Sequence, residues 1–337
     1  MKHVLVTGGG GFLGIHLVRR LRERGVAVRS FQRSFYPELD QLGVQQFRGD
    51  LAVDRNTLNQ AAAGCDLVFH VAAKAGVWGS YDSYHQANVE GTLNVLNACH
   101  KAGIQRLVYT SSPSVTFDGR DQEGVDESAP YPKSFLAHYP ATKAKAEQMV
   151  VEFADDRLAT VSLRPHLIWG PGDQHLVPRV VERAEAGRLR LVGDDTKLVD
   201  TLYIDNCVDA HLAAAERLAP GAAISGKTYF ITNGEPLPMA AILNGILKAA
   251  GKTPVEKRVS PRLAYVVGTV METGAGLLRM RNEPPMTRFV AAQLGTAHWF
   301  NIEAAKRDLG YEPAVSMAEG FRRLAEAFQR EGAWWRR

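Results

Sequence analysis

The sequence predicts an α/β protein with a Rossmann-type, doubly wound parallel sheet and a smaller C-terminal substrate lobe. Strand-like apolar segments alternate with helical stretches up to about residue 165, and the first strand runs into the glycine-rich turn Gly8–Gly14 before a helix. Strands that alternate with helices in this way form parallel sheets. We expect residues 1–165 to form a dinucleotide-binding core, with a return from about 200–235. Residues 166–337 should form mainly the substrate lobe, interleaved with that core.

The predicted strands are short apolar segments between helical stretches. In chain order they cover residues 4–6, 26–31, 44–47, 67–69, 107–109, 160–163 and 229–231.

Beyond Pro165 the pattern is less regular, with a loop near Gly170 and a helix near 178–186. Ser260 and Pro261 predict the start of another helix, because serine caps helices and proline suits the first helical position. Ser316 with Glu319 is a capping box for the last helix.

The glycine-rich turn predicts a dinucleotide site. Gly8, Gly11 and Gly14 would allow a sharp turn, close approach of a pyrophosphate to the backbone, and tight packing of the helix on the sheet. Phe12 and Leu13 lie between these glycines, where the first amides of the helix would face the phosphates. A purely structural glycine turn is the alternative.

The end of the second strand indicates which dinucleotide binds. An acidic residue there would hold the adenosine ribose and favour NAD. This chain has Gln32 and Arg33 instead, and a guanidinium can pair with a 2′-phosphate. We expect NADP(H). If Arg33 is only a solvated loop residue, the site would also accept NAD(H).

A second pattern indicates the chemistry. Tyr139 and Lys143 are four residues apart, so a helix would place both on one face. Ser112 follows a buried strand, at the sheet edge where open α/β folds bind ligands. These three residues are the predicted catalytic set. Free tyrosine titrates near 10, so Tyr139 needs nearby positive charge, from Lys143 and an oxidised nicotinamide, to act as a base at neutral pH.

Together these residues resemble the extended short-chain dehydrogenases/reductases, in particular the 3β-hydroxysteroid dehydrogenase-like branch. Further matching segments are Asp50-Leu51, residues 70–73, residues 88–92, Arg164-Pro165, residues 203–206 and residues 309–313. The resemblance implies that Ser112, Tyr139 and Lys143 are catalytic and that Asn88 is a supporting residue, structural or in a proton relay. It also implies cofactor contacts from Asp50, which would face adenine, and from Leu51, Ala72, Tyr139, Lys143 and Pro165. Asp50 could alternatively cap the helix from Asp54.

Within this branch the chain is most similar to the 2-alkyl-3-oxoalkanoate reductases of bacterial long-chain olefin biosynthesis. Residues 76–81, 110–115, 164–173 and 233–236 carry this resemblance. It implies an NADP(H)-dependent reductase that interconverts 2-alkyl-3-oxo and 2-alkyl-3-hydroxy acids. The alternatives are an NAD(P)-dependent 3β-hydroxysteroid or sterol dehydrogenase, a nucleotide-sugar epimerase, and a non-catalytic dinucleotide sensor that binds partner proteins.

A long-chain keto acid needs an apolar trough and a group that holds its carboxylate. Residues 263–271 are apolar and would either line or cap this trough, or form a buried helix. Lys74, His138 and His166 flank the motifs and are candidate carboxylate contacts, although a surface lysine or a core histidine is the simpler interpretation. The tail from Trp334 would fray, or would dock on a membrane surface or a partner enzyme.

Composition limits the remaining classes. A net charge of +4 over 337 residues, without basic runs, argues against nucleic-acid binding. Three cysteines without a Cys-x-x-Cys pair indicate neither disulfides nor a metal site, and we expect a cytoplasmic protein without a transmembrane segment. The resemblance implies a homodimer through helices near 83–102 and 137–154, and contacts with other olefin-pathway enzymes.

Overall fold

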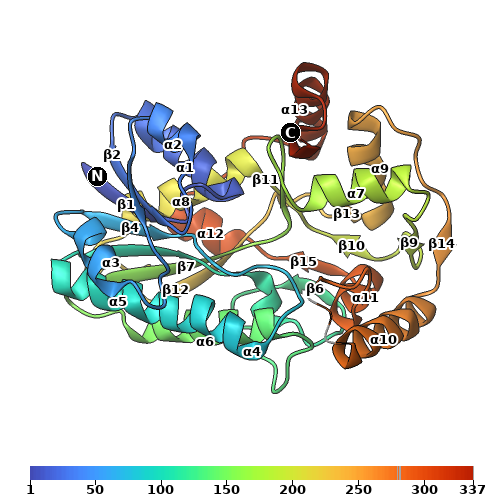
Figure 1. The fold of residues 1–337 in the computed structure, drawn as a ribbon, viewed down its shortest axis with the longest axis horizontal. Helices are drawn as coiled ribbons and strands as arrows, with labels where there is room; N and C mark the ends of the chain where they lie inside the picture. Colours follow the sequence, from blue (N-terminus) through green and yellow to red (C-terminus); the bar gives the residue numbers. More distant parts are fainter. Residues whose placement is uncertain (279, 281, 337) are drawn as a thin grey trace.

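A seven-stranded parallel sheet forms the centre of the larger lobe in the computed structural model, which describes residues 1–278, 280 and 282–336 (Figure 1). Its order is β12-β7-β5-β4-β1-β2-β3. The strands are β1 (His3–Thr7), β2 (Ala27–Gln32), β3 (Gln45–Arg48), β4 (Leu67–His70), β5 (Arg106–Thr110), β7 (Ala159–Pro165) and β12 (Lys227–Ile231). This sheet confirms the predicted fold class, and each predicted strand lies in it within one or two residues of its expected bounds.

Helices cover both faces of this sheet (Figure 1). One face carries α1 (Phe12–Glu23), α8 (Ile204–Arg217) and α12 (Glu303–Leu309), and the other carries α3 (Arg55–Ala62), α5 (Gly91–Ala102) and α6 (His138–Glu152). α1 buries Leu17, Val18 and Leu21, which recur at helical spacing and so form one apolar face. The shorter α2 (Pro37–Gln41) and α4 (Tyr81–Tyr84) lie at the periphery, and a π-helical segment, His85–Glu90, joins α4 to α5.

The smaller lobe is built on a four-stranded sheet of order β13-β10-β15-β6. Its strands are β6 (Gln122–Val125), β10 (Leu198–Val199), β13 (Leu237–Pro238) and β15 (His298–Phe300). The two-residue strands β8 (Ile168–Trp169) and β11 (Leu202–Tyr203) pair, as do β9 (Leu191–Val192) and β14 (Arg258–Val259). The helices of this part of the chain are α7 (Leu176–Glu185), α9 (Met239–Ala249), α10 (Pro261–Leu277), α11 (Arg288–Gly295) and α13 (Met317–Glu331).

β6 lies within the first 165 residues of the sequence but pairs with β15 of the smaller sheet. Its sequence, Gln-Glu-Gly-Val, has no apolar alternation, so sequence patterns do not reveal it.

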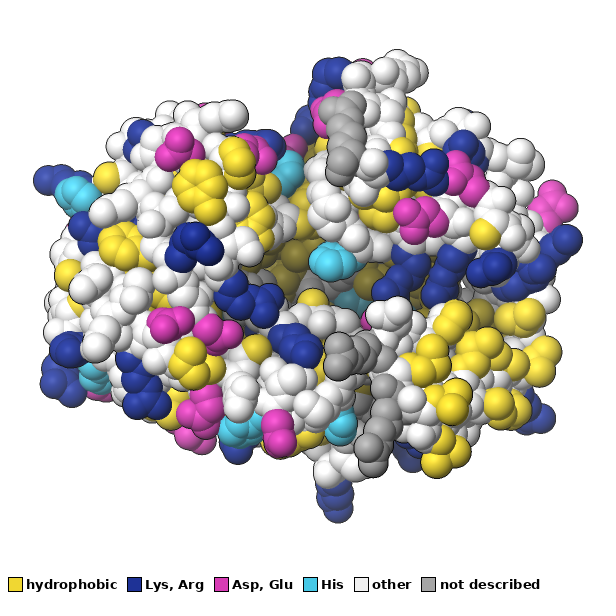
Figure 2. All heavy atoms as spheres, in the orientation of Figure 1, with side chains coloured by type: hydrophobic (Ala, Val, Ile, Leu, Met, Phe, Trp, Pro, Cys, Tyr) yellow, Lys and Arg dark blue, Asp and Glu magenta, His cyan; other side chains and the backbone are white. Residues whose placement is uncertain are grey.

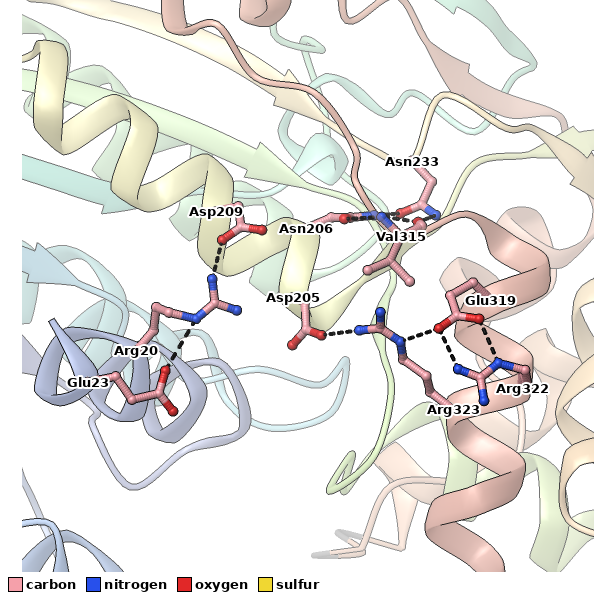
Figure 3. A network of polar contacts seen from close by, with 10 residues as sticks. All are labelled: Arg20, Glu23, Asp205, Asn206, Asp209, Asn233, Val315, Glu319, Arg322 and Arg323. Carbon is pink, nitrogen blue, oxygen red and sulfur yellow. Dashed lines mark hydrogen bonds and ion pairs between the residues drawn. The ribbon is translucent and has the colours of Figure 1, made fainter.

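Polar side chains fasten α8 to its neighbours (Figure 3). Arg20 of α1 pairs with Asp209 at 2.7 Å, and Arg323 of α13 pairs with Asp205 at 3.0 Å. The buried Asn206 side chain donates to the Val315 carbonyl at 2.8 Å and accepts from the Val315 amide at 2.9 Å. α8 is therefore tied both to the first helix of the sheet and to the last helix of the chain.

α10 differs from expectation. Its predicted start is confirmed, because Ser260 caps the helix by accepting from the Leu263 amide. The helix is neither buried nor part of the trough: Leu263 and Val270 are 53% and 67% exposed, and no residue from 263 to 271 lines the cavity described below. The buried residues of α10 are small, namely Ala264, Gly268 and Ala275, and Figure 2 shows an apolar patch over this end of the molecule.

The C-terminal tail is not frayed. The Trp334 indole donates to the Asp173 carbonyl and the Trp335 indole donates to the Glu182 carboxylate, each at 2.9 Å. Both rings also contact Phe328 of α13, and Arg337 lies outside the described residues. The expectation of a loose end fails because the two indoles find polar partners in α7 and in the loop before it, and an apolar partner on α13. No helix within the described ranges has the length and apolar character needed to cross a membrane.

Candidate active site

A cavity of about 840 Å³ opens at the carboxyl ends of the parallel strands, beside the smaller lobe, and Figure 2 shows the surface hollowed there. Every predicted catalytic and cofactor-contacting residue lines it: Gly8, Gly11, Phe12, Leu13, Gly14, Arg33, Asp50, Leu51, Ala72, Ser112, Tyr139, Lys143 and Pro165. The cavity contains the point between β1 and β4 where the strand order reverses, the usual ligand position in open α/β sheets.

The glycine turn has the geometry that a pyrophosphate requires. Gly8 has φ +74°, and a Cβ on Gly14 would lie 2.1 Å from the Gly8 carbonyl oxygen, so neither position accepts another residue without a shift. A Cβ on Gly11 would approach only that same oxygen, at 3.3 Å. No side chain caps α1 and no acidic residue occupies its first turn, which leaves the positive helix end available to phosphate.

The adenosine end is bounded by the loops after β2 and β3. The Gln32 side chain is 8% exposed, accepts from Ser30 and donates to Gln46 at 3.0 Å, whereas Arg33 is exposed at the cavity wall. Among the described residues, the carboxylates that line the cavity are those of Asp50 and Asp173. Neither is at the end of β2, where Gln32 is followed by Arg33.

Asp50 does not cap the helix that follows it. α3 starts at Arg55, its N-cap is Asp54, and the Asp50 carboxylate instead accepts from the Ala52 amide at 2.8 Å. The capping alternative is therefore wrong, since a tight turn separates Asp50 from the helix.

Tyr139 and Lys143 lie on the first two turns of α6, and Ser112, two residues beyond the end of β5, reaches Tyr139. Burial raises the pKa of Tyr139, and a hydrogen bond with Ser112 opposes this rise. Burial lowers the pKa of Lys143 to about 7, which Glu147 opposes, and its ammonium donates to the Thr110 carbonyl at 2.6 Å. In this structure Tyr139 thus holds its proton at neutral pH.

Glu147 is a residue that sequence analysis missed. Its side chain is fully buried, pairs with Arg164 at 2.6 Å and accepts from the Tyr131 hydroxyl at 2.7 Å. Glu147 follows Lys143 by four residues, as Lys143 follows Tyr139, so the same helical spacing could have revealed it.

Asn88 makes structural hydrogen bonds. Its amide bonds both the backbone nitrogen and the carbonyl of Lys74, at 2.7 and 3.2 Å, and donates to Thr142 on α6 at 3.1 Å. It therefore joins the loop after β4 to the helix that carries Tyr139.

The smaller lobe supplies the other wall of the cavity. Gln122, Phe289, Gln293, His298 and Phe300 line it, as do Lys74 and His166 of the larger lobe, and the His166 ring packs against His298 and Phe300. His138 does not line the cavity; it packs against the rings of Tyr81 and Tyr84. The prediction that His138 contacts the substrate carboxylate is wrong, because the first turn of α6 directs its side chain towards α4. No cluster of His, Cys, Asp and Glu suited to a metal ion occurs in the described part of the chain.

Comparison with known proteins agrees with this geometry. A model of the 3-beta hydroxysteroid dehydrogenase/isomerase family matches residues 5–260. A 2-alkyl-3-oxoalkanoate reductase of Stenotrophomonas maltophilia is 59% identical, over 95% of this chain and 98% of that protein. One of Shewanella oneidensis is 51% identical, over 96% and 86%. Among solved structures, MoeE5 in complex with UDP-glucose and NAD has a TM-score of 0.75 at 25% identity, covering 98% of this chain and 99% of that one.

Proposed function

The chain belongs to the 3-beta hydroxysteroid dehydrogenase/isomerase family, and on this basis we propose that it is an NADP(H)-dependent reductase of 2-alkyl-3-oxoalkanoic acids. The product would be the 2-alkyl-3-hydroxyalkanoic acid of a long-chain olefin pathway. The observation that carries the proposal is the Ser112, Tyr139 and Lys143 set in a dinucleotide cavity, in a chain 59% identical to a reductase with this substrate.

The residues of the cavity suit a dinucleotide. The amides at the start of α1 would hold the pyrophosphate, Asp50 the adenosine end, and Lys143 the ribose next to the nicotinamide. When bound, the reduced nicotinamide supplies the hydride for the C3 carbonyl carbon.

The protein's own part is proton transfer and charge stabilisation. Tyr139 would donate its hydroxyl proton to the carbonyl oxygen as that oxygen gains charge, and its raised pKa keeps the proton in place until then. Ser112 would donate a second hydrogen bond to the same oxygen. Lys143 would stabilise the resulting phenolate when it is protonated.

NADP(H) is the favoured cofactor because Arg33 lies on the cavity wall without an acidic neighbour on β2. The Gln32 amide is hydrogen-bonded to Ser30 and Gln46. It is therefore less available to accept hydrogen bonds from the ribose hydroxyls than a carboxylate at this position would be.

The second candidate is a 3β-hydroxysteroid dehydrogenase, which the family itself favours. Its substrate would need the same catalytic set and an apolar wall, which Phe289 and Phe300 supply. A homodimer, contacts with olefin-pathway enzymes and a cytoplasmic location stay predictions.

The test is an oxidative assay, because 3-oxo acids decarboxylate spontaneously. Purified protein is mixed with NADP⁺ or NAD⁺ and a racemic long-chain 2-alkyl-3-hydroxy acid, or with a 3β-hydroxysteroid, and reduced nicotinamide is followed by absorbance. We expect NADPH to appear with the hydroxy acid, and Tyr139→Phe to lower kcat about 10²–10⁴-fold while cofactor binding persists. Tyr81→Phe, an exposed tyrosine outside the cavity, is the control. Activity with the steroid and NAD⁺ alone would overturn the proposed substrate and cofactor.

A further inference from the structure

Lys74 stands beside the proposed reaction centre because of the strand order. β4 and β5 are neighbouring parallel strands, with His70 opposite Tyr109. Lys74 follows His70 by four residues and Ser112 follows Tyr109 by three, so both leave the same edge of the sheet. Both line the cavity. Lys74 is thus on the catalytic side of β1, whereas Arg33 follows β2 on the other side.

The Lys74 side chain is held in place at both ends. Its backbone nitrogen and carbonyl bond the Asn88 amide, at 2.7 and 3.2 Å. Its ammonium donates to the Ser83 hydroxyl at 2.8 Å and lies 4.8 Å from the centre of the Tyr84 ring. A lysine fixed in this way loses less side-chain entropy when a ligand binds.

The Lys74 ammonium has no acidic partner within ion-pair distance in the described part of the chain. The other Lys and Arg side chains of the cavity wall are paired or lie elsewhere in the cavity. Arg179 pairs with Glu283 at 3.2 Å, Lys143 bonds the Thr110 carbonyl, and Arg33 lies at the adenosine end. An ammonium carries three donors, of which Lys74 uses one for Ser83. The remaining donors suit an anion.

We propose that Lys74 binds the carboxylate of the substrate and so selects acids over neutral ketones. This inference rests on the proposed function, which supplies a substrate whose carboxylate lies two carbons from the reacting carbon. Charge-assisted hydrogen bonds from lysine to carboxylate are among the stronger polar contacts in proteins.

Among the described residues three histidines line the cavity, and two of them, His166 and His298, are poorer carboxylate ligands. His166 and His298 pack edge to face with ring centres 4.9 Å apart. His298 is further tied to the Gln293 carbonyl at 2.7 Å. Burial lowers the pKa of both imidazoles, so they stay neutral at physiological pH. They supply no positive charge, whereas Lys74 does.

The experiment compares a racemic long-chain 2-alkyl-3-hydroxy acid with its methyl ester, which has the same carbon chain but no negative charge. Both are oxidised with NADP⁺ by the wild type, Lys74→Met, Lys74→Arg and Lys145→Met. Lys145 is an exposed lysine of α6 outside the cavity and is the matched control. We expect Lys74→Met to lower kcat/KM for the acid about ten-fold or more, mainly through KM, and to change the ester by less than about two-fold.

Lys74→Arg should restore most of the preference for the acid, and Lys145→Met should resemble the wild type. If Lys74→Met affects acid and ester equally, or affects neither, the inference is wrong while the proposed function stands. A wild type that oxidises the ester but not the acid would also overturn it. A wild type that oxidises neither compound would overturn the proposed function, and this inference with it.

Discussion

Lys143 and Glu147 lie one turn apart on α6, and both side chains are almost completely buried, with 1% and 0% exposure. Burial lowers the pKa of Lys143 to about 7, and the carboxylate of Glu147 opposes this loss of charge. Glu147 is in turn held by Arg164. A buried ion pair one turn beyond the reaction centre therefore helps to set the protonation state of the lysine.

Removing the negative charge at Glu147 should change the pH dependence of reduction. In Glu147→Gln the pKa of Lys143 should fall further, because no carboxylate then favours the ammonium. Reduction needs protonated Lys143 beside Tyr139, so kcat/KM should decline as pH rises through about 7 in the wild type and at lower pH in the variant. The substrate is the methyl ester of a 2-alkyl-3-oxo acid, which does not decarboxylate.

Tyr131→Phe is the control for this change, since it removes one hydrogen bond to Glu147 but keeps the carboxylate. Glu147→Gln also leaves Arg164 without its partner, which should cost about 3–5 kcal/mol of unfolding free energy, measurable by urea unfolding. A destabilised variant with an unshifted pH profile would show that the pair acts on stability alone.

Arg33→Ala should weaken NADPH binding about ten-fold and leave NADH binding nearly unchanged. The guanidinium is expected to contact only the 2′-phosphate, which NADH lacks. Dissociation constants for both cofactors can be measured by quenching of protein fluorescence. Equal changes for the two cofactors would show that Arg33 does not read the 2′-phosphate.

Gly14→Ala should abolish cofactor binding and lower Tm. A Cβ there would lie 2.1 Å from the Gly8 carbonyl oxygen, so α1 must move away from the phosphate turn. Gly274→Ala is the matched glycine control, because a Cβ at that position of α10 meets nothing within 4 Å. It should stabilise the helix by up to about 1 kcal/mol. Cofactor titration and thermal unfolding of both variants test this; normal NADPH affinity in Gly14→Ala would contradict it.

Deleting residues 334–337 should lower Tm by about 2–6 °C, because two indole hydrogen bonds and their ring contacts with Phe328 are lost. Arg336→Ala should have little effect, since its ion pair with Glu185 is exposed. Thermal unfolding followed by circular dichroism measures both. An unchanged Tm after the deletion would mean that the tail contributes nothing to stability.

Much of the fold and of the candidate site could be predicted because the signals are local. The apolar strands, the turn through Gly8 and Gly14, and the cap at Ser260 each depend on residues a few positions apart, and the structure contains all of them. The same holds for the four-residue spacing of Tyr139 and Lys143 on α6. The geometry of helices, strands and turns converts such spacings directly into positions in space.

Other features depend on residues far apart in the chain, and the amino-acid pattern alone does not reveal them. β6 pairs with β15 across more than half of the sequence, and the indole of Trp334 reaches the carbonyl of Asp173. The apolar face of α10 is exposed because no other element in the described part of the chain packs on it, which its own sequence cannot show. Likewise, Lys74 lacks an acidic partner among residues 1–278, 280 and 282–336 only because of what surrounds it after folding. Local spacing in the sequence determined the strands, the glycine turn and the placement of Tyr139 and Lys143 on one helix. Tertiary structure determined the pairing of distant segments and which side chains are exposed or unpaired, because these depend on long-range packing.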